Sequence, residues 1–176
     1  MFPKFLVPTD IEIFNVNDQS IEISKCIVAF SKWTVEPVKE TFGGKPIVSF
    51  DSKPMFAEIA IVTAFHNDGW DARWVKTSGR GKKVPICLSE WKDDKYKNQI
   101  CTPIEENEIA KLISDIAMIN SNSYSGCWDV VAWKGGSVIF AESKRTKKDS
   151  ISSTQNNWLA SGLKYDLLPV NFMIVQ

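Results

Sequence analysis

The sequence predicts an α/β protein in which a mixed sheet is flanked by helices. Apolar residues make up 44% of the 176 residues, which suits one domain with a substantial core. From residue 54 onward the hydrophobic patterns indicate, in order, a helix, a strand, an insert, two strands, a helix and a final strand. Before that, alternating apolar and polar residues indicate strands. We therefore expect a β-rich N-terminal extension over residues 1–50 and a main domain over 51–176, with an insert at about 78–125.

The elements of the extension and the first helix follow from local signals. Residues 11–14 and 21–23 alternate apolar with polar side chains, as half-buried strands do. Ser52 precedes Lys53-Pro54, and proline is favoured at the first position of a helix. The apolar residues that follow have helical spacing up to His66, so a helix is expected over 54–66.

The remaining elements are indicated by their periodicity and by the turn residues between them. A basic, glycine-containing loop over 76–83 follows a strand, and the insert contains one helix. The expected strands span residues 70–75, 128–133, 138–144 and 170–175, and the expected helices span 104–120 and 150–163.

The two central strands place acidic residues opposite each other. A two-residue turn at Gly135-Gly136 sets the register so that Asp129 faces Glu142. Lys144 then lies on the same face as Glu142. Carboxylates about 5 Å apart repel by roughly 3 kcal/mol at an effective dielectric of about 20, and a divalent cation between them reverses the sign of the interaction. The alternative is a solvent-exposed strand end at which Lys144 bridges the two acids.

The same region resembles a known family. Its motifs lie in residues 126–131, 138–144 and 149–159, and they are similar to the VRR-NUC branch of the PD-(D/E)XK nucleases. In the family's Pro-Asp strand, Trp128 replaces the proline and Asp129 is kept. The Glu-Val-Lys strand corresponds to Glu142-Ser143-Lys144. The D-x-L-S-x-x-Q-x-x-W helix motif is matched by Asp149, Ile151, Ser152, Gln155 and Trp158, with isoleucine in place of leucine.

This resemblance implies a restriction-endonuclease-like core, with an α-β-β-β-α-β order, and a metal-dependent active site. Mg²⁺, for which Mn²⁺ substitutes, would be ligated by Asp129, Glu142 and the backbone carbonyl of Ser143. Glu58, on the preceding helix, would hold a metal-bound water or a second ion. Lys144 would act on the attacking water or the phosphate, and Gln155 would orient the site. The expected catalytic residues are Glu58, Asp129, Glu142, Lys144 and Gln155.

The predicted function is hydrolysis of DNA phosphodiester bonds by an endonuclease or exonuclease, with a structure-specific role at flaps or junctions in repair or recombination as one option. Two alternatives stay open. One is a restriction or defence nuclease on the same core. The other is a non-catalytic nucleic-acid-binding module with a relict site.

The expected partner is DNA, bound through a local patch because the net charge is zero. The densest basic run could equally be a solvated loop. No apolar run is long enough to span a membrane, and the four cysteines form no C-x-x-C pair, so we expect an intracellular protein without zinc. A homodimer is left open. The candidate DNA-binding residues are Arg73, Lys76, Arg80, Lys82, Lys83, Arg145 and Lys147.

Overall fold

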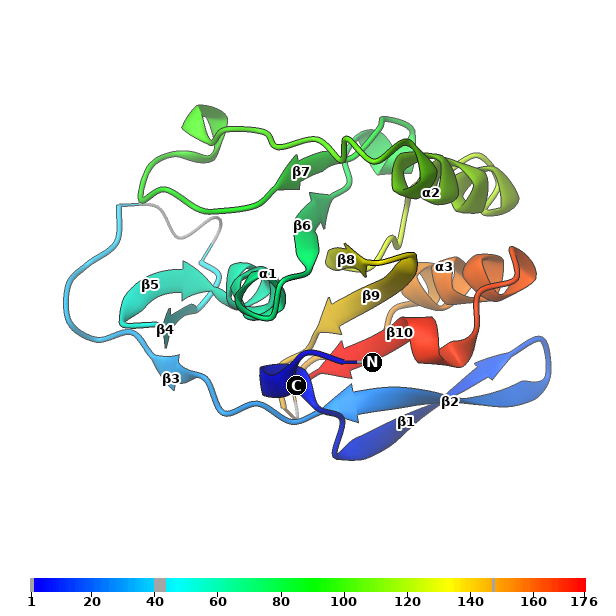
Figure 1. Cartoon of the computed structure of the whole chain (residues 1–176), viewed down its shortest axis with the longest axis horizontal. Helices are drawn as coiled ribbons and strands as arrows, with labels where there is room; N and C mark the ends of the chain where they lie inside the picture. The colour runs from blue at the N-terminus through cyan, green and yellow to red at the C-terminus, as the bar shows by residue number, and fades with distance from the viewer. Residues whose placement is uncertain (1, 40–43, 147) are drawn as a thin grey trace.

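The computed structural model describes residues 2–39, 44–146 and 148–176. Within these ranges the chain forms a seven-stranded sheet and a smaller three-stranded sheet (Figure 1). The large sheet is mixed, because β10 runs parallel to both of its neighbours while the other pairs are antiparallel. Its strands, in spatial order, are β1 (Asp10–Val16), β2 (Gln19–Cys26), β10 (Phe172–Val175), β9 (Ser137–Ser143), β8 (Val130–Lys134), β6 (Asp71–Lys76) and β7 (Ile86–Leu88).

Helices cover both faces of this sheet, as the sequence predicts. Successive residues of β8 point to opposite faces of the sheet, so Val130 and Val131 belong to different hydrophobic clusters. The cluster on one face is built on α1 (Ala57–Asn67), and the cluster on the other on α2 (Asn107–Ile119) and α3 (Ser153–Lys164). Short 3-10 helices lie at Lys4–Leu6, Gly79–Gly81, Tyr96–Asn98 and Pro169–Asn171.

The strands predicted near the N-terminus are confirmed, and they join the large sheet. Asn17 and Asp18 both have positive φ, which is the geometry of a tight hairpin turn between β1 and β2. β2 then pairs in parallel with β10, at the other end of the chain. The smaller sheet, which packs beside α1, consists of β3 (Ser31–Lys32), β4 (Ile47–Phe50) and β5 (Lys53–Phe56).

The expected start of the first helix at Pro54 is wrong. Asp51 and Ser52 have φ values of 50° and 60°, so they form a two-residue hairpin turn between β4 and β5. Pro54 therefore lies in a strand, and α1 begins at Ala57. The pairing of β5 with β4 prevails over the local preference of proline for a helix start. This later start puts Glu58 in the first turn of α1.

The predicted register of the central hairpin is confirmed. Lys134 pairs with Ser137, and the ladder continues to Val130 opposite Ala141. β8 begins at Val130, so Asp129 lies one residue before the ladder, in a bend. The helices expected over 104–120 and 150–163 are present with ends shifted by a few residues.

Candidate active site

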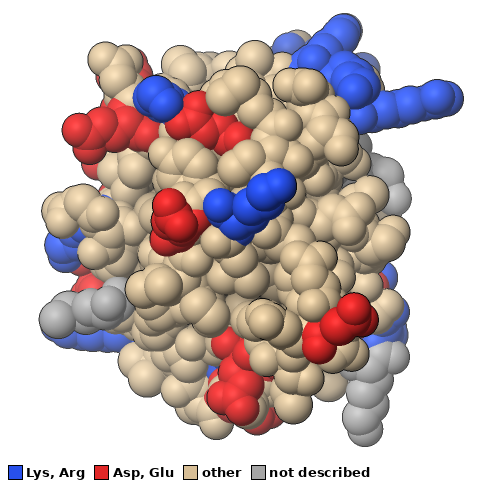
Figure 2. All heavy atoms as spheres, turned by 90° about the vertical axis from the view of Figure 1, so that its right-hand side faces the viewer, with Lys and Arg blue, Asp and Glu red and all other residues tan. Residues whose placement is uncertain are grey.

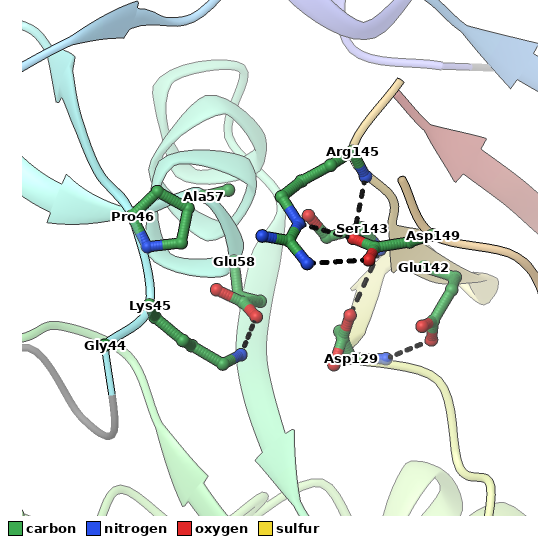
Figure 3. Close-up of a pocket in the computed structure, with 10 residues that line it drawn as sticks. All are labelled: Gly44, Lys45, Pro46, Ala57, Glu58, Asp129, Glu142, Ser143, Arg145 and Asp149. Atoms are coloured by element: carbon green, nitrogen blue, oxygen red, sulfur yellow. Dashed lines mark hydrogen bonds and ion pairs between the residues drawn. The ribbon is translucent and has the colours of Figure 1, made fainter. Parts of the chain in front are cut away.

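The two predicted carboxylates lie together where β8 begins and β9 ends. The backbone N–H of Asp129 donates to Glu142 Oε2 at 3.2 Å, and the backbone N–H of Ser143 donates to Asp129 Oδ2 at 3.1 Å. Each acid therefore accepts a hydrogen bond from the other strand (Figure 3). Glu142 is only 2% exposed, so the alternative of a solvent-exposed strand end does not hold.

Burial of Glu142 and partial burial of Asp129 disfavour the charged forms of the two carboxyl groups. Desolvation raises the pKa of Asp129 well above its ordinary value, and the neighbouring carboxylates of Glu142 and Glu58 raise it further. Desolvation also raises the pKa of Glu142, although the Lys144 ammonium opposes this shift. Negative charge at this position is therefore costly unless a cation compensates it.

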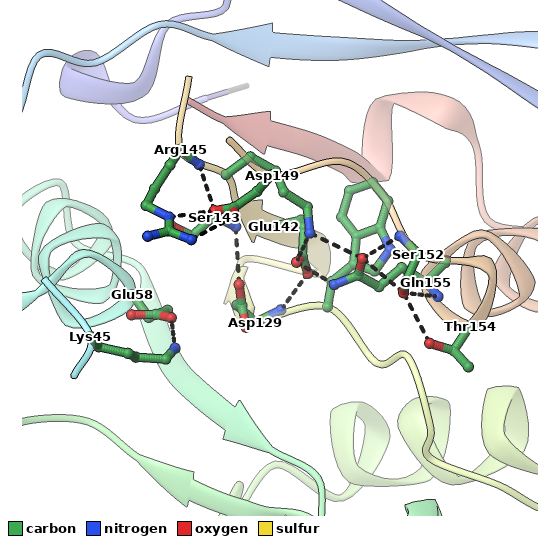
Figure 4. A network of polar contacts seen from close by, with 12 residues as sticks. Lys45, Glu58, Asp129, Glu142, Ser143, Arg145, Asp149, Ser152, Thr154 and Gln155 are labelled. Carbon is green, nitrogen blue, oxygen red and sulfur yellow. Dashed lines mark hydrogen bonds and ion pairs between the residues drawn. The ribbon is translucent and has the colours of Figure 1, made fainter. Parts of the chain in front are cut away.

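Lys144 and Gln155 hold Glu142 from the side of α3. The Lys144 ammonium lies 2.9 Å from Glu142 Oε1 and 3.0 Å from Gln155 Oε1. Gln155 Nε2 donates to the same Glu142 oxygen, which closes a three-membered network (Figure 4). Lys144 thus joins Glu142 to Gln155, and its position beside Glu142 is the one predicted from strand alternation.

The first turn of α3 fixes the position of Gln155. Ser152 is the N-cap: its hydroxyl accepts the Gln155 N–H, while Gln155 Oε1 accepts the Ser152 N–H at 2.9 Å. This reciprocal pair is a capping box, so one carboxamide both closes the helix and contacts Lys144. Ser-x-x-Gln before a helix is a recognisable signature of this arrangement, and the sequence carried that signal.

The segment before β8 packs directly on this turn. Trp128 is fully buried, and its indole N–H donates to the backbone carbonyl of Gln155 at 3.2 Å. At Gly126, φ is +79° and an added Cβ would overlap the backbone carbonyl of Thr154. Trp128 therefore links the acidic hairpin to the helix.

A cleft of about 400 Å³ opens over the acidic pair. Glu58, buried in the first turn of α1, reaches this cleft and forms an ion pair with Lys45. Four of the residues expected in the active site thus line one cleft, and Lys144 and Gln155 contact it through Glu142; the four are Glu58, Asp129, Glu142 and Ser143. The lining residues are Gly44, Lys45, Pro46, Ala57, Glu58, Asp129, Glu142, Ser143, Arg145 and Asp149.

Sequence reasoning missed two features of this cleft. Lys45 comes from a segment to which no chemistry is assigned, and nothing in the local pattern pairs it with Glu58. Arg145 was expected to contact DNA, but its guanidinium makes two hydrogen bonds of 2.8 Å to Asp149. The hydrogen bonds from Arg145 are the main reason why the pKa of Asp149 falls to about 2.

The other basic residues occupy different surroundings. Lys76 lines a second cleft, of about 300 Å³, together with Lys45, Asp129 and Gln155. Arg73 is engaged in the fold, because its guanidinium donates to the Thr102 carbonyl at 3.0 Å and lies over the Trp133 ring.

The basic loop packs on the segment that leads to β8. The Gly81 carbonyl accepts the Tyr124 N–H at 2.8 Å, and Arg80, Lys82 and Lys83 are exposed. Figure 2 shows one side of the molecule, where basic and acidic side chains are scattered and one basic group projects at a corner. Lys147 lies outside the described residues. Contact of these residues with DNA stays a prediction.

The donor atoms of the cleft fit a hard cation. Asp129 and Glu142 offer carboxylate oxygens to the cleft, and oxygen donors are those that Mg²⁺ prefers. Across the described ranges, no group of three or more His, Cys, Asp or Glu side chains is arranged to hold a metal ion. Mg²⁺ commonly binds one or two carboxylates and keeps several waters, so a site of this kind need not contain three such side chains.

Comparisons with protein-family models, curated protein sequences and solved structures found no match to this chain. None of the helices in the described parts of the chain is long and apolar enough to cross a membrane.

Proposed function

We propose that this chain is a metal-dependent nuclease that hydrolyses DNA phosphodiester bonds, similar to the VRR-NUC branch of the PD-(D/E)XK nucleases. The observation that carries the proposal is the hydrogen-bonded set of Asp129, Glu142, Lys144 and Gln155 beside one cleft. The succession α1, β6, β8, β9, α3 and β10 is also the order expected for a restriction-endonuclease-like core.

In the proposed reaction the acidic pair and the Ser143 carbonyl would hold Mg²⁺ or Mn²⁺. Such an ion, when bound, would lower the pKa of water and supply positive charge beside the phosphate. Gln155 fixes the orientation of Glu142 through Nε2 and that of Lys144 through Oε1. Lys144, whose side chain is 11% exposed, contributes a positive charge beside Glu142, which would help to stabilise negative charge that develops on the attacked phosphate.

The substrate would approach over the second cleft and the basic loop. Lys76 lines that cleft beside Asp129, and a positive charge there suits a phosphate next to the scissile one. Because the chain has no net charge, affinity for DNA must come from local contacts of this kind, and the log–log slope of affinity against salt should be about −0.9 for each phosphate contacted.

The test is cleavage of single-stranded, duplex, flap and four-way-junction DNA in Mn²⁺ and in chelator. Cleavage should require the ion, and Asp129→Asn or Glu142→Gln should reduce it at least about 100-fold, as removal of one group that stabilises transition-state charge does. Glu12→Gln is the matched control, because Glu12 is a surface carboxylate paired with Lys25 on β1 and β2.

Full cleavage by both active-site variants would refute the site. DNA binding without cleavage of any substrate would favour a non-catalytic binding module. Cleavage confined to one DNA sequence would favour a restriction or defence nuclease.

A further inference from the structure

We propose that Lys45 takes the place of a second divalent cation, so that the active site binds one metal ion rather than two. This inference rests on the proposed function, since it concerns the same cleft. Lys45, which no motif identifies, thereby has a role in the active site. Glu58 binds the Lys45 ammonium, and not the metal-bound water or second ion that was expected.

The first support is the pairing of Lys45 with Glu58. The ammonium contacts Glu58 Oε1, and the Glu58 side chain is only 9% exposed whereas that of Lys45 is 37% exposed. Figure 4 shows this pair on one side of Asp129, with Glu142 and Gln155 on the other. A cation ligated by Glu58 would have to displace the ammonium or sit beside it, and like charges disfavour that.

The second support is that Lys45 is held in place by more than one group. Its ammonium lies 5.2 Å from the centroid of the Trp74 ring, a distance within the range of a cation–π contact. Trp74 is itself 2% exposed, so the ring is fixed in the core beneath the cleft. The lysine is therefore better positioned than a surface lysine with a single partner.

The third support is the place of Lys45 between the two clefts. Among the described residues, Lys45 and Asp129 line both of them. Glu58, Lys45 and Asp129 all line the first cleft, so the ion pair borders the space in which the expected ion would lie. Lys45 and Asp129 therefore border the same space, in which a phosphate beside the expected ion would lie. Lys45 thus supplies the charge that a second ion would otherwise bring.

The test counts metal ions without substrate. Isothermal titration of the full chain with Mn²⁺ should give one ion per wild-type chain and two per Lys45→Met chain. Adding Glu58→Gln to Lys45→Met should return the count to one, because the second ion then loses its carboxylate. Lys45→Arg should keep one ion. Lys25→Met, which removes the lysine of the surface pair with Glu12, is the matched control and should also keep one.

Two ions per wild-type chain, or one per Lys45→Met chain, would overturn the inference. If two ions bind and the wild type cleaves DNA, the proposed function stands and only the role of Lys45 is wrong. A wild-type chain that binds no ion and cleaves no DNA overturns both proposals. Each variant is checked for a cooperative melt, and Lys45→Gln, with the same expected counts, replaces Lys45→Met if that variant does not fold.

Discussion

Replacing Asp129 by asparagine should change how stability depends on pH and on metal ions. Burial and neighbouring carboxylates raise the pKa of this acid in the folded chain. Above its ordinary pKa of 3.8 the folded state therefore binds more protons than the unfolded state. The free energy of unfolding therefore falls as the pH rises from 3.8 to the raised pKa of the folded chain. For one proton, the fall is up to about 1.4 kcal/mol per pH unit. Asp129→Asn removes this loss, so without metal it should be at least as stable as wild type at pH 7.

A divalent cation should reverse this ranking. An ion present at 100 times its dissociation constant stabilises the folded chain by about 2.7 kcal/mol. For a chain of 176 residues each kcal/mol corresponds to roughly 2–4 °C, so the melting temperature of wild type should rise by about 5–11 °C. Protons compete with the ion for the carboxylates, so this rise should be larger at pH 8 than at pH 5.

The assay is thermal melting of wild type, Asp129→Asn and the control Glu12→Gln, with and without Mn²⁺, at both pH values. The rise should be lost in Asp129→Asn and kept in Glu12→Gln. An equal rise in Asp129→Asn, or a rise in wild type that does not depend on pH, would refute the idea that the ion binds this buried pair.

Three further predictions concern the surroundings of the site. Gly126→Ala should destabilise the chain and lower cleavage more than Gly136→Ala. Both glycines have a φ of +79°, but only an alanine at 126 would overlap the first turn of α3. Equal losses of stability in the two variants, measured by denaturant unfolding, would contradict this. Ser152→Ala should lower the free energy of unfolding by about 0.5–2 kcal/mol, because the helix loses its cap. Gln155→Ala should lower kcat as well as stability. Equal kcat for the two variants would argue against a positioning role for Gln155. Neutralising the exposed basic loop should flatten the salt dependence of DNA binding in Ca²⁺ by up to about 3 in log–log slope, and an unchanged slope would show that the loop is only a connection. The residues neutralised together are Arg80, Lys82 and Lys83.

The parts of the site that the sequence alone determined are those governed by local geometry. The two-residue turn at Gly135-Gly136 sets the register of β8 and β9, and a constant index sum then brings Asp129 beside Glu142. Alternation of side chains along β9 puts Lys144 next to Glu142. Each of these two contacts depends on only a few residues that are close in the sequence, so the sequence pattern is enough to predict it.

Other features were decided only by the tertiary structure. The helix start at Ala57 depends on the pairing of β5 with β4, which prevails over the preference of Pro54. β2 joins the sheet through β10, from opposite ends of the chain. Lys45 meets Glu58 because the residues just before β4 and the first turn of α1 border the same cleft. Such contacts follow from the packing of whole elements. A side chain to which the local sequence pattern assigns no role acquires its partner only when that packing forms.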